Sequence, residues 1–243
     1  MLFRSINEIT EDGEKNLAVA VEYDREVSRV SVTPDAFEIQ GRTIITLYTS
    51  KSCAMVGEKN SADGKYVIIE LDGRDCNANT IVHVSPDKRH RVISTCAIRQ
   101  SKTLIASGGA LILPWERFLP VDYAVNEVFD QFRPGVYVDR KNGNHMKYQL
   151  FLPRDYHVTG SYPLILFFHG GGEKGDDNFA PLLASQGGSI WAFDAVAEEH
   201  PAVVLVPQCP AECDWIDPDT YELGECFYTV CRLLFSVMDK YAI

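Results

Sequence analysis

Short runs of β-branched and aromatic residues recur along the first half of the chain, separated by turn residues. The runs occupy residues 17–23, 27–32, 43–48, 66–71, 80–84, 92–98 and 104–113. Pro, Asp and Gly stand between them, as in Thr33-Pro34-Asp35. Runs of this length that are bounded by turn signals predict the strands of an antiparallel sandwich. No helical period competes with this interpretation in the first half.

The pattern changes after residue 114. Residues 163–168 and 202–206 are continuous apolar runs, as expected for strands covered on both faces. A helix is predicted over roughly residues 190–199. Apolar positions between residues 223 and 241 recur three or four apart, which predicts a final helix of about twenty residues. Buried strands that alternate with helices indicate a parallel α/β sheet.

The two patterns predict two domains. Residues 1–120 are expected to form an all-β immunoglobulin-like sandwich, and residues 121–243 to contribute to an α/β sheet. Composition agrees, because 243 residues with 46% hydrophobic and 23% charged residues are typical of a globular protein. The formal net charge of −11 repels phosphate groups, so neither nucleic acid nor an anionic membrane is expected as a partner.

The N-terminus lacks the apolar core of a signal peptide. The sequence as given is therefore expected to be cytoplasmic, or secreted or periplasmic if a leader has been removed. The seven cysteines are irregularly spaced and are interpreted as free thiols. Cys209-x-x-x-Cys213 with His200 nearby offers too few ligands for a tetrahedral zinc site, so neither a metal nor a cofactor is expected. His83 and His90 have no second ligand at an interpretable spacing.

A glycine-rich segment, HGGGEKGDDN at residues 169–178, follows directly after the predicted strand at 164–168. Consecutive glycines let the backbone turn sharply and leave main-chain N–H groups uncovered. In an acyl-transfer enzyme such amides stabilise the oxygen that becomes negative in the tetrahedral intermediate. One donor of this kind contributes roughly 2.7–4 kcal/mol to transition-state stabilisation. A strand followed by HGGG is typical of lipases and esterases.

Here the chain resembles two-domain α/β-hydrolase carboxylesterases that carry an N-terminal immunoglobulin-like domain. They are relatives of the polyhydroxybutyrate-depolymerase-like and feruloyl-esterase-like hydrolases. The resemblance rests on YQLFLP at 148–153, YPLILFFHGGGEKGDDN at 162–178, and VLVPQCP at 204–210 followed by Trp215. It implies that residues 121–243 are the first part of an α/β-hydrolase parallel sheet. The implied substrate of the full-length parent is a small-molecule or polymer-linked ester.

The same resemblance assigns roles to residues of the glycine segment and its surroundings. The amides of Gly171 and Gly172 would be the oxyanion-hole donors. His169 and Gly170 would shape the loop. A further pair of side chains would lie near the active-site rim, namely Gln208 and Trp215.

The chain departs from this family in one respect. No G-x-S-x-G nucleophile elbow occurs in it, and neither Ser185 nor Ser189 lies on a strand-to-helix elbow. A triad built from these serines with His157 or His200 has no sequence support. No catalytic residue is therefore expected in this chain. The triad is expected downstream of Ile243, and these residues alone should not hydrolyse esters.

Other interpretations of the second half remain. A non-catalytic binding or assembly module could self-associate through an incomplete sheet edge. Gly170-x-Gly172-x-x-Gly175 also satisfies the dinucleotide fingerprint, but the strand at 202–206 is not followed by a ribose-binding acid. A phosphate loop would need Lys where Asp176 stands. A purely structural glycine turn stays open. The acidic run that ends in Asn178 is predicted to cap a helix.

Overall fold

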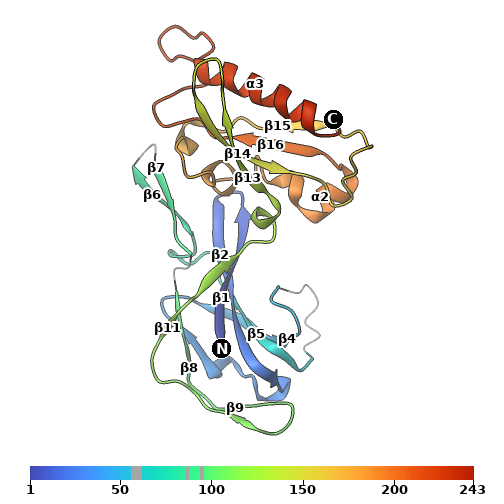
Figure 1. The fold of residues 1–243 in the computed structure, drawn as a ribbon. Coiled ribbons are helices and arrows are strands. Elements are labelled where there is room, and N and C mark those ends of the chain that lie inside the picture. Colours follow the sequence, from blue (N-terminus) through green and yellow to red (C-terminus); the bar gives the residue numbers. More distant parts are fainter. Residues whose placement is uncertain (56–61, 86–87, 94–95) are drawn as a thin grey trace. The chain divides into compact units, whose positions relative to one another are not determined.

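The chain forms two compact units in the computed structural model (Figure 1). The structure describes residues 1–55, 62–85, 88–93 and 96–243. The first unit comprises residues 1–8, 14–80 and 91–126. The second comprises residues 9–13, 81–90 and 127–243. Two short segments from the N-terminal half of the sequence thus belong to the second unit.

The first unit is built from strands. A five-stranded sheet has the order β12-β1-β2-β5-β4, a three-stranded sheet has the order β11-β8-β3, and β9 pairs with β10. The strands are β1 (Leu2–Thr10), β2 (Gly13–Val27), β3 (Phe37–Ile39), β4 (Ile44–Ser50), β5 (Gly64–Leu71), β8 (Ala97–Gln100), β9 (Leu104–Ile105), β10 (Leu111–Ile112), β11 (Leu119–Pro120) and β12 (Tyr123–Val125). Side chains of both larger sheets share one core, in which Val19 and Ile69 lie with Ile98.

Several predicted strands of the first unit differ in the structure. Residues 27–32 contain a 3-10 turn, Arg29–Ser31, because the Ser31 hydroxyl donates back to the carbonyl of Ser28. The run at 104–113 is split into β9 and β10, with Gly109 in the left-handed region at φ 84°. β1 and β3 were not predicted. The expected all-antiparallel pairing is also wrong at one edge, since β1 pairs with β12 in parallel.

The second unit contains a four-stranded sheet in the order β13-β14-β16-β15. Its strands are β13 (Arg133–Val138), β14 (His145–Phe151), β15 (Leu164–Leu166) and β16 (Val203–Pro207). The prediction of a parallel sheet holds only for β15 with β16. β14 is antiparallel to both β13 and β16. A tight hairpin, in which Gly143 takes a φ of 77°, makes β13 and β14 antiparallel. The loop at residues 152–163 then reverses the chain, so β15 and β16 both run opposite to β14.

Helices cover both faces of this sheet. One face is covered by α3 (Glu225–Lys240) (Figure 1). Val203 and Leu205 pack in one core with residues of this helix. Val204 and Val206 point to the other face, where Leu182 of α1 (Ala180–Leu183) lies. All residues of β16 are buried, as the continuous apolar run predicted. No helix among the described residues is both long enough and apolar enough to cross a membrane.

The helices are shorter than predicted. The segment at 190–199 is a 3-10 turn, Ile190–Ala192, followed by α2 (Asp194–Glu199). Phe193 lies between them in an extended conformation, so the 3-10 turn and α2 are separate elements. The final helix begins only at Glu225, because Gly224 is also extended.

A hairpin of β6 (Ile81–Ser85) and β7 (Lys88–Arg91) completes the strands. Its Ile81 is buried in the core that contains Leu182 and Val204. Ile9, near the end of β1, lies in the same core. These contacts explain why residues 9–13 and 81–90 belong to the second unit.

Candidate functional site

The glycine segment forms a tight turn directly after β15. The amide of Phe167 still donates to the carbonyl of Leu205, 3.0 Å away, so the chain leaves the sheet only after this point. Gly170 is extended, and Gly171–Glu173 form one 3-10 turn. Within the described part of the chain, the amides of Gly171 and Gly172 donate no backbone hydrogen bond. A Cβ at Gly171 would have nothing within 4 Å, so this part of the turn borders open space.

His169 is a buried support of this turn. Its Nε2 accepts a hydrogen bond of 2.9 Å from the amide of Cys209. The proton of the neutral ring is therefore on Nδ1, which donates to the carbonyl of Gly170 at 2.7 Å. Burial lowers the pKa of His169 below its ordinary value of 6.5. Both ring nitrogens are engaged by backbone groups, so His169 is not placed to act as a base. Its role in shaping the loop stays a prediction.

Gln208 and Trp215 hold the loop from two further directions. The Gln208 carboxamide is buried and accepts from the amide of Asn178 at 2.6 Å, while its Nε2 donates to the carbonyl of Glu173 at 3.0 Å. The Trp215 indole N–H donates to the carbonyl of His169 at 3.1 Å. Both side chains thus lie beside the glycine turn and act on its backbone. Their placement at an active-site rim stays a prediction.

The acidic residues after the turn have different roles. Oδ1 of Asp177 accepts from the amides of Phe179 and Ala180, both at 2.8 Å, so it satisfies donors at the start of α1. The N-cap position itself is Phe179, which makes no side-chain cap hydrogen bond, so Asp177 supports the start of the helix from two residues before the cap. Asp176 is exposed and forms an ion pair with Lys147, with Nζ and Oδ2 3.8 Å apart.

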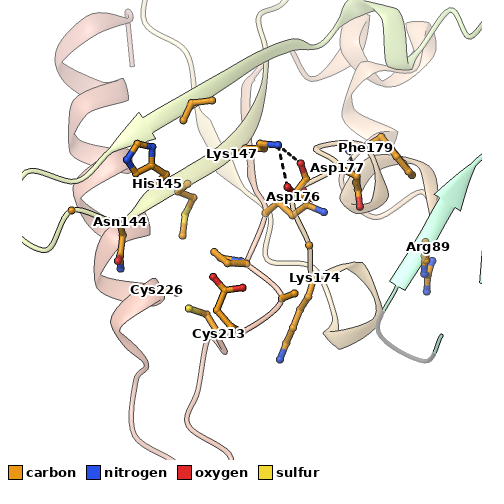
Figure 2. Close-up of a pocket in the computed structure, with 18 of the residues that line it drawn as sticks. Arg89, Asn144, His145, Lys147, Lys174, Asp176, Asp177, Phe179, Cys213 and Cys226 are labelled. Carbon is orange, nitrogen blue, oxygen red and sulfur yellow. Dashed lines mark hydrogen bonds and ion pairs between the residues drawn. The ribbon is translucent and has the colours of Figure 1, made fainter. Parts of the chain in front are cut away.

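A cavity of about 970 Å³ lies beside these acidic residues (Figure 2). Lys147, Lys174 and Asp176 lie in its wall, together with Gln208 and Cys213. Of the six residues singled out by the resemblance, only Gln208 lines it. The cavity and the open side of Gly171 are therefore separate features of the second unit.

Three cysteine thiols gather near this cavity. Cys209 and Cys226 are buried in one core, and Cys213 packs against it. Burial raises the pKa of the Cys213 thiol to about 12, so it is protonated at neutral pH and is a poor nucleophile. Among the described residues, no group of three or more potential ligands is placed to hold a metal ion. His200 instead lies beside Glu199, with Nε2 and Oε1 3.8 Å apart.

The serines and histidines considered for a triad do not come together. The Ser185 hydroxyl accepts from the amide of Gly187, and the buried Ser189 hydroxyl has no partner within the described residues. The ring of His157 pairs with Thr159. No hydrogen bond between a serine hydroxyl and a histidine ring is found in the part of the chain that the structure describes.

Comparison with known proteins agrees with the sandwich and with the fold of the whole chain. Residues 3–113 match the esterase Ig-like N-terminal domain. This confirms the prediction of an immunoglobulin-like domain. The fold is also that of a thermostable esterase of known crystal structure, with a TM-score of 0.92 and 27% sequence identity. The match covers 100% of this chain and 67% of the esterase chain. No curated protein matches the chain.

Sequence reasoning missed the partners that hold the glycine turn. Arg89 forms an ion pair with Glu173, and Lys174 pairs with Asp214. Neither Arg89 nor Asp214 belongs to a motif that could have signalled a role. Their relevance comes only from the fold, which brings β7 and the segment after β16 to the same turn.

Proposed function

We propose that this chain carries the oxyanion-binding part of a serine carboxylesterase of the α/β-hydrolase type. The observation that carries the proposal is the turn after β15, where the Gly171 and Gly172 amides have no backbone acceptor among the described residues. The turn lies in a chain with the fold of an esterase and an esterase-type Ig-like domain. The proposed substrate is a small-molecule or polymer-linked ester.

The sheet order supports the position of this turn. β15 has one strand neighbour, β16, among the described residues. A further parallel strand on the free side of β15 would end beside the glycine turn, because the carboxyl ends of parallel strands meet at one edge. A serine on an elbow after such a strand would then stand next to the amides of Gly171 and Gly172.

The chemistry follows from these positions. Attack of a serine Oγ on the ester carbonyl converts the carbonyl oxygen to an oxyanion, and the two amides would donate to it. Each donor is worth roughly 2.7–4 kcal/mol of transition-state stabilisation. The base that accepts the serine proton is a different residue from His169, since His169 is occupied by Gly170 and Cys209.

The nucleophile, the base and the acid are proposed to lie outside these residues. The sequence contains no G-x-S-x-G. An oxyanion hole without a nucleophile has no intermediate to stabilise. The 243 residues by themselves are therefore expected to be inactive toward esters.

The test uses the protein encoded by the complete reading frame that contains these residues. Gly171 is the first residue of its 3-10 turn, and the extended Gly170 before it is compatible with a following proline. Gly171→Pro therefore removes one N–H donor with little change to the turn. The expected result is a fall of about 10²–10³ in kcat for p-nitrophenyl acetate, with KM nearly unchanged.

Gly171→Ala is the matched control, because it adds a Cβ in the same open space but keeps the N–H. It is expected to lose less than about tenfold in kcat. Equal losses in the two variants would contradict a donor role for this amide. A complete protein that hydrolyses no ester would contradict the esterase proposal itself.

A non-catalytic assembly module is the second candidate, favoured by the free side of β15. Sedimentation velocity of the 243-residue chain distinguishes it. Concentration-dependent dimers support this candidate, whereas a monomer that unfolds cooperatively argues against it.

A further inference from the structure

An ion pair lies across the three glycines of the turn. Nη2 of Arg89 and Oε1 of Glu173 are 3.1 Å apart, and the two side chains are only 14% and 15% exposed. Nη2 is also 2.9 Å from the place where a Cβ of Gly172 would stand. The other carboxylate oxygen, Oε2, is 3.1 Å from the corresponding place at Gly170. The pair therefore closes the turn at Gly170 and Gly172 and leaves Gly171 open between them.

The guanidinium comes from a well-anchored element. Arg89 lies on β7, which pairs with β6, and Ile81 of β6 is buried in the core shared with Leu182. Nε of Arg89 is buried and has no hydrogen-bond partner among the described residues. A buried donor without a partner destabilises the folded chain. The position of the Arg89 side chain is therefore not explained by the stability of the hairpin alone.

We propose that Arg89 is a positioning residue that fixes the conformation of the glycine turn through Glu173. Three consecutive glycines have more backbone freedom than any other tripeptide, whereas oxyanion donors act only when they are held in place before the reaction. The ion pair restrains this freedom without touching Gly171. The inference rests on the proposed function for its catalytic meaning, but the restraint itself is a property of the 243-residue chain.

The restraint is tested by hydrogen–deuterium exchange of peptides that cover residues 168–176. Arg89→Ala is expected to speed exchange in this segment about fivefold, the factor that 1 kcal/mol produces, with no change elsewhere in the sheet. Arg89→Lys keeps one charge but not the fork of the guanidinium, so it should give a partial rescue. Arg154→Ala is the matched control, because it removes an exposed pair with Asp194.

A second variant keeps the inference testable if Arg89→Ala perturbs folding. Gly172→Ala is expected to displace Nη2, and combining it with Arg89→Ala should add no further increase in exchange, because both changes remove the same contact. Unchanged exchange in Arg89→Ala, or an equal effect in Arg154→Ala, would overturn the inference.

Activity of the complete protein separates this inference from the proposed function. Arg89→Ala should lower kcat there and leave KM unchanged. Loss of protection in the turn of a protein without any esterase activity would contradict the proposed function but not the positioning role. Full esterase activity with an unchanged turn in the variant would contradict the positioning role alone.

Discussion

Two of the places where the molecule buries polar groups differ in their hydrogen bonding. In the first unit the fully buried carboxylate of Glu14 accepts from Arg91 through two nitrogens, at 2.9 and 2.7 Å. It also accepts from the hydroxyl of Thr80 and the side-chain amide of Asn126, each at 2.7 Å. Each oxygen thus has two donors, and no capacity remains for a ligand.

The glycine turn of the second unit is also held by hydrogen bonds from side chains, but some of its backbone N–H groups have no backbone acceptor among the described residues. His169, Gln208 and Trp215 are each bonded to its backbone, whereas Gly171 and Gly172 keep N–H groups without a backbone acceptor in the described part of the chain. A saturated cluster stabilises a fold. A supported turn with spare donors is suited to bind an anion that forms during a reaction.

The largest effect on stability is expected at the saturated cluster. Glu14→Gln removes the charge from a fully buried carboxylate that pairs with Arg91 and should lower the free energy of unfolding by about 3 kcal/mol. Urea denaturation measures this change. Glu38→Gln, which breaks the more exposed pair with Arg99, should cost less than about 1 kcal/mol. Equal losses would show that burial of the Glu14 cluster does not matter.

A smaller loss is expected at the support of the glycine turn. Gln208→Ala leaves the amide of Asn178 and the carbonyl of Glu173 without their partner and should cost about 2 kcal/mol. Thermal unfolding followed by circular dichroism measures it. Ser101→Ala, where the hydroxyl donates at the surface to the carbonyl of Asp35, is the control with little expected change. A loss no larger than that of the control would mean that Gln208 does not support the turn.

The glycines of the turn should differ from one another. Gly172→Ala must displace Arg89 and is expected to cost about 1 kcal/mol. Gly171→Ala meets nothing and restricts the unfolded chain, so it should be neutral or stabilising by about 0.5 kcal/mol. The same urea experiment compares the two. Equal stability of the two variants would contradict the crowding described at Gly172.

The smallest effect is a pH dependence that comes from His169. Its folded pKa lies below 6.5, so as the pH falls below this value the unfolded chain takes up a proton that the folded chain does not. The contribution of His169 to the free energy of unfolding should therefore decrease as the pH falls below about 6.5 and stay constant above it. His169→Gln, whose oxygen can accept from Cys209, should lose this part of the pH dependence. An identical pH profile in the variant would contradict the lowered pKa of His169.

The sequence predicted the parts of the fold that depend on uninterrupted apolar runs. β15, β16 and α3 were found because their apolar residues are continuous or regularly spaced, although the residues of β15 are only partly buried. β1 was missed because its buried positions include Ser5 and Asn7, whose polar side chains bond with each other instead of facing water.

The candidate site was predicted to a similar extent. The glycine turn is a local motif and could be identified from the sequence. Arg89 could not, because Glu173 lies far along the chain and nothing in the residues around Arg89 signals that contact. Of the hairpin that carries Arg89, only β6 was predicted, as the strand at residues 80–84, and β7 was missed. The place of the hairpin in the second unit depends on the burial of Ile81.

The most direct test of the central claim is labelling of the 243-residue chain with a fluorophosphonate, which reacts with activated serines, followed by intact-mass and peptide analysis. The proposal of an oxyanion turn without its nucleophile predicts no adduct on any serine of residues 1–243, whereas the protein from the complete reading frame should carry one. An adduct on a serine within these residues, such as Ser185 or Ser189, would contradict the claim that the nucleophile lies elsewhere.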